Sequence, residues 1–206
     1  AAAAGAGAAG AGAAEDRFTK RQEKVAYSSQ ESAGLPGQSN RDVAKYLDLG
    51  EGLRVARLDR PKLPEGDADA AREVQEGDRV TVDLIGYLTG YNGLVFVRTQ
   101  DKSGFSVKPL TFTVGANQAI PGLDRGIRGM VKGEKRRIVI PASLGYPRPM
   151  SDEDFGKPGT LPNPMESSSA NGEPWELRNR LLNGVLNNSN RDDTLCMDVK
   201  VVRISR

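Results

Sequence analysis

The chain contains no histidine and a single cysteine, Cys196. The lack of histidine excludes Ser-His-Asp triads, Cys-His pairs and histidine-ligated metal sites. One cysteine cannot form an internal disulfide or a thiolate metal cluster, so we expect Cys196 to be a small apolar residue of a strand. The chain is therefore expected to work without acid–base histidine, metal or redox sulfur, and no cofactor is predicted.

Aromatic and other apolar residues are also scarce. Aromatics make up 5% and hydrophobic residues 37% of the 206 residues, beside 24 glycines and 12 prolines. This is lean for a chain packed over its whole length, so part of it is expected to lie outside the core. No run approaches the roughly 18 apolar residues that a membrane-spanning helix needs. The net charge is only +2, and no nucleic-acid surface is indicated. The densest basic cluster, residues 132–137, predicts a turn and the solvated face of a strand, or alternatively a partner-binding patch.

One stretch, residues 112–146, has a clear local order. Its apolar residues recur at gaps of 3, 4 and 3, which predicts one helical face formed by Ile120, Leu123, Ile127 and Met130. Pro121 suits the first helical position, where its missing N–H costs nothing. Gly133 is expected to stop the helix, and residues 136–141 are typical of a strand. The stretch therefore predicts a compact strand–helix–strand unit.

The segments around this unit mostly predict strands. Apolar or alternating residues mark four of them, at 53–58, 79–88, 94–98 and 194–205. Ser39 and Asn40 can cap a short helix over residues 42–49, which Gly50 would end. This order of elements favours the α+β class, with an antiparallel sheet of five to six strands wrapped around one short helix.

Four motifs in the central stretch carry a family resemblance. They are F-x-x-G from Phe112, I-P-G-x-x-x-G from Ile120, G-M-x-x-G-E-x-R from Gly129 and I-P-x-x-x-x-Y ending at Tyr146. Together they resemble the FKBP-type peptidyl-prolyl isomerases, over roughly residues 50–146 and 194–205. The resemblance implies a sheet curled around the short helix, with an apolar pocket between them that accepts a prolyl ring.

The resemblance also implies a role for individual residues. Phe96 matches the aromatic that lines the pocket, Ile120 the residue whose backbone N–H grips the substrate, and Tyr146 the tyrosine whose hydroxyl donates to substrate carbonyls. The matching pocket positions are Leu84, Val97, Leu110, Phe112, Ala119, Leu123 and Met197. Proline-containing protein segments are the implied partners. Each of these apolar residues would also serve as core in any sheet-on-helix domain.

The sequence departs from the family pattern at the polar side of the pocket. Val97 stands where active members carry an aspartate, and Leu84 stands where a tyrosine helps to hold that aspartate. Leu123 replaces a tryptophan, while Leu110 and Met197 replace two phenylalanines. Two functions remain open: a prolyl isomerase and folding helper of low activity, or an inactive FKBP-like binding or assembly subunit.

A long insertion, residues 147–193, separates Tyr146 from the last strand. Loops of this length in a compact domain are usually functional or disordered. A helical patch within it carries the candidate partner-docking residues Trp175, Leu177, Leu181, Leu182, Val185 and Leu186. They could pack on the domain itself, cover the pocket as a lid, or dock a partner protein. An insertion with an aromatic-led helix at this place resembles FKBP-type proteins of the chloroplast thylakoid lumen in plants and algae.

The first residues predict an extension rather than a core. Residues 1–14 are alanine and glycine, and residues 15–38 are polar, as in an arm or linker. Small residues of this kind suit the cleavage region of a signal sequence, which fits the lumenal location that the resemblance implies. We expect an extension over 1–50 and an FKBP-like domain over 51–206. By the same resemblance, a larger photosynthetic membrane complex could be reached through the arm or the insertion.

Overall fold

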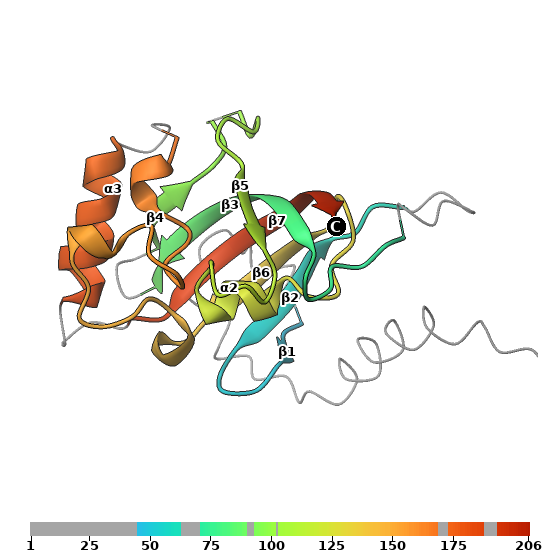
Figure 1. The fold of residues 1–206 in the computed structure, drawn as a ribbon, viewed down its shortest axis with the longest axis horizontal. Coiled ribbons are helices and arrows are strands. Elements are labelled where there is room, and N and C mark those ends of the chain that lie inside the picture. The colour runs from blue at the N-terminus through green and yellow to red at the C-terminus, as the bar shows by residue number, and fades with distance from the viewer. Residues whose placement is uncertain (1–44, 63–70, 90–92, 102, 169–172, 188–192) are drawn as a thin grey trace, which may run out of the picture.

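A single antiparallel sheet organises the computed structural model, which describes residues 45–62, 71–89, 93–101, 103–168, 173–187 and 193–206 (Figure 1). Its strands are β1 (Leu47–Asp48), β2 (Arg54–Asp59), β3 (Arg79–Leu88), β4 (Leu94–Arg98), β5 (Leu110–Thr113), β6 (Lys135–Ile140) and β7 (Leu195–Ser205). They run in the order β1-β2-β6-β7-β3-β4, and β5 also pairs with β3. The predicted α+β fold is confirmed, with the two-residue β1 added to the expected strands.

The strands lie where alternation of apolar residues predicts them. β3 and β4 have the predicted bounds, and β2, β6 and β7 begin or end within one residue of theirs. β3 pairs with three strands: with β7 along its whole length, with β5 along its first half and with β4 along its second half. Its apolar residues Val80, Val82 and Leu84 are buried. Burial of this face against the helix fixes the register of the sheet.

The central helix α2 (Pro121–Gly126) lies against β6 and is shorter than the apolar spacing predicts. Pro121 occupies its first turn, as expected. Beyond Gly126 the chain continues in turns, so Ile127 and Met130 are buried but not helical. A Cβ at Gly126 would lie 2.7 Å from Ile138 Cγ2. The missing side chain therefore allows the helix to approach the sheet closely.

The helix predicted over residues 42–49 is wrong where the structure describes it; residues 42–44 lie outside the described part. Leu47 and Asp48 instead form β1 and pair with Val55 and Arg54 of β2. Gly50 takes a φ of 92° in the turn that joins them. Pairing with β2 and burial of Leu47 override the local capping signal, which is a weak preference by comparison.

The solvated strand face predicted within residues 132–137 is also wrong, because Arg136 and Arg137 are buried. Arg136 pairs with the buried Glu134 at 2.9 Å and donates to the carbonyl of Gly126 at 3.0 Å. Arg137 makes two bonds of 2.6 Å to the carboxylate of Asp198. Buried charges need such partners, so these arginines tie β6 to α2 and β7.

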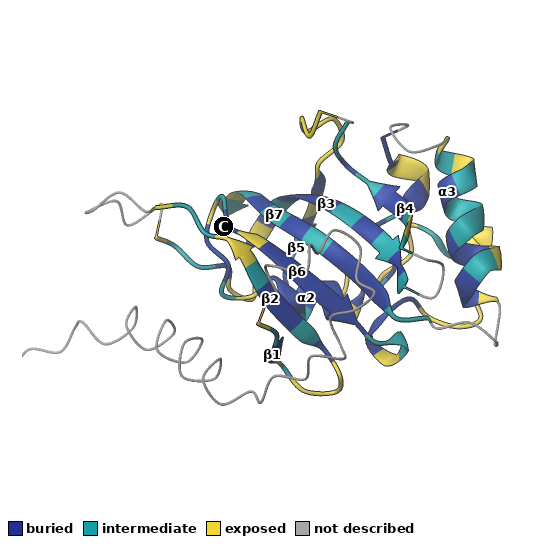
Figure 2. Ribbon diagram, turned by 180° about the vertical axis from the view of Figure 1, so that it is seen from behind, coloured by how far each residue is buried: buried dark blue, intermediate teal, exposed yellow. Residues whose placement is uncertain are grey.

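The insertion folds back onto the domain beside β4 (Figure 1). Its described part contains the helix α3 (Pro174–Leu181), the π-helical turn η5 (Leu182–Leu186) and two 3₁₀ turns, Asp152–Asp154 and Pro164–Glu166. A further 3₁₀ turn, Ala142–Leu144, lies just before the insertion. Five of the six candidate docking residues are buried within the protein: Leu177, Leu181, Leu182, Val185 and Leu186. The expectation that these five dock a partner is therefore corrected, since they pack against the domain. Trp175 differs, with 53% of its surface exposed. The ribbon of α3 carries both buried and exposed stretches (Figure 2).

Several expectations concern residues that the structure does not describe. Residues 1–44 lie outside the described part, so the division at residue 50 stays a prediction. Among the described residues, no helix is long and apolar enough to cross a membrane. The Arg148–Pro149 and Leu161–Pro162 peptide bonds are cis.

Candidate functional site

The residues predicted for the pocket come together in one apolar cluster. They belong to five places in the fold: Leu84 on β3, Phe96 and Val97 on β4, Leu110 and Phe112 on β5, Met197 on β7, and Ala119, Ile120 and Leu123 around the start of α2. Tyr146 joins them from the segment after the Ala142–Leu144 turn. All ten side chains are buried. These side chains fill the space between the sheet and the helix, here called the chamber, where the resemblance places the pocket. The chamber is therefore closed to solvent.

Gly86 on β3 lets the side chains of β4 that line the chamber, Phe96 and Val97, pack closely. A Cβ at Gly86 would lie 2.6 Å from Val97 Cγ1 and 2.7 Å from Phe96 Cε1. Such contacts are too short for any side chain, so only glycine lets Phe96 and Val97 pack directly on the backbone of β3. Gly86 was not among the predicted site residues.

Aromatic rings line one end of the chamber. The rings of Phe96 and Tyr146 meet edge to face, with centroids 6.2 Å apart and an interplanar angle of 80°. Phe155, from the insertion, packs on the other side of Tyr146 at 6.2 Å and 75°. Edge-to-face pairs of this kind are favourable, so the Tyr146 ring is held between the body of the domain and the insertion.

The two hydrogen-bond donors of the site point at the insertion. The backbone N–H of Ile120 donates to the carbonyl of Leu161 at 2.9 Å, and the Tyr146 hydroxyl donates to the carbonyl of Pro162 at 2.6 Å. In return, the Leu161 N–H donates to the carbonyl of Gln118 at 3.2 Å. Leu161 also stands opposite Ala119 as an isolated parallel bridge. The predicted donors are therefore brought together, and both already hold consecutive carbonyls of this chain.

The sequence prediction also missed Leu161 and Pro162, whose carbonyls occupy the two donors. The available signal was an X-Pro pair inside a proline-rich insertion that follows the pocket tyrosine. That signal is weak, because the contact is made through backbone carbonyls, which every residue carries.

Burial controls the protonation of the one ionisable group that points into this contact. Removal from water raises the pKa of the Tyr146 hydroxyl well above its ordinary value. Burial thereby extends the protonated form to more alkaline pH. A tyrosine of ordinary pKa, about 10, is already protonated at neutral pH and can donate to a carbonyl. A carboxylate could not do this, since it only accepts when ionised.

The apolar wall lacks the acid that the family pattern places there. Leu84 and Val97 are both buried, as befits a pocket side that carries no polar group. The carboxylate of the neighbouring Asp83 is already engaged: it accepts from Thr99 Oγ1 at 3.2 Å and from Ser106 Oγ at 2.7 Å. These hydrogen bonds tie the Asp83 carboxylate on β3 to the loop that follows β4.

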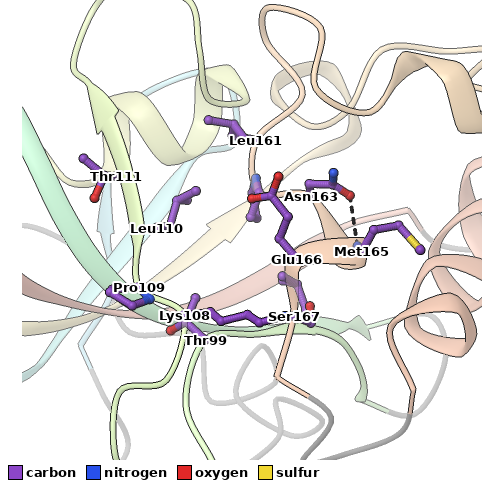
Figure 3. Close-up of a pocket in the computed structure, with 12 residues that line it drawn as sticks. Thr99, Lys108, Pro109, Leu110, Thr111, Leu161, Asn163, Met165, Glu166 and Ser167 are labelled. Atoms are coloured by element: carbon purple, nitrogen blue, oxygen red, sulfur yellow. Dashed lines mark hydrogen bonds between the residues drawn. The ribbon is translucent and has the colours of Figure 1, made fainter.

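An open cavity of about 500 Å³ remains beside the closed chamber (Figure 3). The β4–β5 region forms one side of it and the insertion the other. Of the predicted pocket residues, Val97 and Leu110 reach this cavity. The lining is Val97, Thr99, Lys108, Pro109, Leu110 and Thr111 facing Leu161, Pro162, Asn163, Met165, Glu166 and Ser167. The cavity therefore borders the Leu161–Pro162 pair directly.

Among the described residues, no group of acidic or sulfur side chains could hold a metal ion.

Comparison with known proteins agrees with the geometry. The family model for FKBP-type peptidyl-prolyl cis-trans isomerase matches residues 70–201. The chain is 32% identical to the chloroplastic peptidyl-prolyl cis-trans isomerase FKBP19 of Arabidopsis thaliana over 186 residues, which are 86% of this chain and 65% of that protein.

Two further Arabidopsis thaliana proteins are similar over a shorter stretch. Identity is 37% over 102 residues with the isomerase FKBP15-1, covering 50% of this chain and 63% of that protein. Identity is 38% over 107 residues with the chloroplastic isomerase FKBP17-1, covering 50% of this chain and 44% of that protein. The chain thus spans less than two thirds of the length of each of these three relatives.

Proposed function

Because the chain belongs to the family of FKBP-type peptidyl-prolyl cis-trans isomerases, we propose that it binds proline-containing protein segments and isomerises them slowly or not at all. The observation that carries the proposal is the pair of donors, Ile120 N–H and Tyr146 OH, on the carbonyls of Leu161 and Pro162. These two carbonyls lie on either side of a proline ring. A site that holds both has the geometry to hold the same pair in another chain.

The family reaction needs no nucleophile. Rotation about an X-Pro bond faces a barrier of roughly 18–20 kcal/mol, because the amide loses its resonance on twisting. A site that binds the twisted amide better than the planar one lowers this barrier. The fixed N–H of Ile120 and the protonated hydroxyl of Tyr146 would hold the carbonyls on either side of the proline ring while the bond turns.

Low turnover follows from the apolar wall. Leu84 and Val97 offer no group that could polarise the twisted amide, and Asp83 is engaged by Thr99 and Ser106. The site can therefore bind the segment, but it gains little extra interaction in the transition state. Binding the planar and the twisted amide equally well does not raise the rate of isomerisation.

A protease-coupled isomerisation assay with a short X-Pro peptide tests this proposal. We expect a rate close to the uncatalysed one for the parent protein and a rise of at least about ten-fold for Leu84→Tyr/Val97→Asp. A hydrogen bond to a charged group contributes about 1.5–3 kcal/mol, and about 1.4 kcal/mol corresponds to ten-fold in rate.

The matched control is Thr111→Asp. It places a carboxylate on the same cavity but away from position 97, so its rate should stay at that of the parent. A parent protein that isomerises the peptide many-fold above background contradicts low turnover. An unchanged rate in the double variant contradicts the role given to the apolar wall.

A second candidate function is that of a binding or assembly subunit in the chloroplast thylakoid lumen, in contact with a photosynthetic membrane complex. Two of the similar Arabidopsis proteins are named as chloroplastic, which supports the compartment. The exposed indole of Trp175 supports a contact at the N-terminal end of α3, because exposed tryptophans are enriched in binding hot spots.

Capture of partners from chloroplast extract on the immobilised protein tests this second function. Trp175→Ala should lose a partner that Leu58→Ala retains, since Leu58 on β2 is exposed to a similar degree, 43%, and does not line the cavity. Equal capture by both variants, or none by the parent, counts against the docking surface.

A further inference from the structure

We propose that residues 160–163, here called the strap, are a built-in occupant of the prolyl site, so that an incoming proline-containing segment binds only when the strap leaves. The strap has the sequence Thr-Leu-Pro-Asn. The proposal rests on the function proposed above, and it adds how access to that site is controlled.

The strap and an incoming segment would compete for the same two donors. The N–H of Ile120 and the hydroxyl of Tyr146 each carry one proton, and the strap accepts both, through Leu161 and Pro162. Gln118 holds the Leu161 N–H as well. A second X-Pro segment cannot make the same bonds while these exist. Occupation by the strap and by a ligand therefore exclude each other.

The strap also closes the chamber. Tyr146 is 3% exposed and Ile120 is fully buried, and Pro162 is buried with them. A ligand thus has no path to either donor with the strap in place. The cavity beside the strap does remain open, and Leu161 and Pro162 form part of its lining. An arriving chain would meet the strap there first.

The strap can leave without unfolding the insertion. Its Thr160 and Pro162 are buried, but Leu161 and Asn163 are only partly buried. The insertion has separate anchors after the strap: the N–H of Ser168 donates to the carbonyl of Arg98 at 2.7 Å, and Ser167 Oγ accepts from the Arg98 N–H at 3.2 Å. The buried leucines of α3 add a further anchor. Release of the strap therefore breaks a few hydrogen bonds and leaves these contacts intact.

The test measures binding of a fluorescein-labelled peptide that carries the strap sequence, Thr-Leu-Pro-Asn, to the full chain by fluorescence polarisation. We expect Leu161→Gly/Pro162→Gly to bind it at least about ten-fold more tightly than the parent, because the parent exposes its site only in the fraction of molecules with the strap released. Pro162→Ala, which disturbs the fold less, should shift affinity in the same direction. Pro158→Gly is the control, since Pro158 is exposed in the same insertion outside the strap, and it should leave affinity unchanged.

Hydrogen exchange of the Leu161 amide in the parent protein gives an independent result. This amide is bonded to Gln118 O, and saturating peptide should speed its exchange if the strap is displaced. Faster exchange together with tighter binding by the strap variants supports the proposal. The strap proposal is overturned if the peptide binds while the Leu161 amide stays protected, or if parent and strap variants bind it with equal affinity. Prolyl binding itself would stand in both cases. No binding by any of the proteins overturns prolyl binding and the strap proposal together.

Discussion

The hydroxyl of Tyr146 makes a hydrogen bond in a dry environment, where its loss should be measurable. Tyr146→Phe removes the donor and leaves the carbonyl of Pro162 without this partner in a buried place. We expect the free energy of unfolding in urea to fall by about 1–3 kcal/mol, the cost of an unsatisfied buried polar group.

Tyr87→Phe is the matched control for this change. Tyr87 is a partly buried tyrosine on β3, and its burial beside Asp198 raises the pKa of its hydroxyl. It takes no part in the contact with the strap described above. A loss in Tyr87→Phe as large as in Tyr146→Phe would contradict a specific role for the Tyr146–Pro162 bond.

Alkaline pH should weaken the fold through the same residue. Burial raises the pKa of Tyr146 well above its ordinary value, whereas an unfolded tyrosine loses its proton near pH 10. Above about pH 10 the folded state therefore binds more protons than the unfolded state, and stability falls with rising pH. This contribution is complete below the unfolded pKa and is lost as pH rises towards the folded one.

Urea unfolding of the parent and Tyr146→Phe at several pH values isolates this effect. Desolvation also raises the pKa of Tyr46 and that of Cys196 to about 12, so the parent should lose stability from more than one group. Tyr146→Phe removes one of them, and its stability should decline less steeply above about pH 10. Parallel pH curves for the two proteins would contradict a buried, protonated Tyr146.

At the scale of elements, the contact between α2 and β6 depends on a missing side chain. Gly126→Ala places a methyl group 2.7 Å from Ile138 Cγ2 and 2.8 Å from its Cδ1. We expect a loss of about 1–3 kcal/mol in the free energy of unfolding, as for other overpacked cores. Ile138→Ala should also destabilise, by removing a buried side chain.

The double variant Gly126→Ala/Ile138→Ala separates a clash from a simple helix effect. It removes the Ile138 atoms that the new methyl group would meet. We expect it to lose clearly less stability than the sum of the two single changes, because the residues are in contact. Additive losses, measured by urea unfolding, would show that α2 and β6 do not approach as closely as the structure has them.

Strands and helices differ in how far the sequence predicts them here. The bounds of β3 follow from alternation, because one of its faces packs on the core and leaves a two-residue period. β4 follows instead from a short apolar run, in which the consecutive residues Phe96 and Val97 are both buried. The helix predicted before Gly50 fails, since pairing of Leu47 with Val55 outweighs a local cap. α2 ends at Gly126 although Ile127 and Met130 keep helical spacing and burial. Spacing predicts which side chains are buried better than it predicts where a helix stops.

In the site, too, the buried side chains could be predicted and the backbone contacts could not. Its side chains, such as Phe96, Leu123 and Tyr146, gather as the family pattern implies. Its occupant could not be predicted, because Leu161 lies 41 positions after Ile120 and the two meet through backbone atoms. A backbone carbonyl has no signature in the sequence. The burial of Arg137 on β6 escaped prediction for a related reason, because its partner Asp198 comes from the distant β7.

At the scale of the whole molecule, the insertion shares the core of the domain. Leu181, Leu182, Val185 and Leu186 lie in the same apolar cluster as the residues around α2. Elements that share one core usually unfold together. The insertion should therefore melt with the sheet, even though the strap within it can be released separately.

The single tryptophan of the chain makes this testable, because Trp175 lies on α3 within the insertion. Tryptophan fluorescence reports the insertion, and far-ultraviolet circular dichroism reports mainly the sheet. We expect both signals to give the same midpoint in urea, as in a two-state transition. Leu181→Ala, at a fully buried position, should shift both midpoints together and cost about 2–5 kcal/mol. Two separate midpoints, or a shift confined to fluorescence, would mean that the insertion is an independent unit; the strap would then sit on the site by docking of that unit and not as part of one fold.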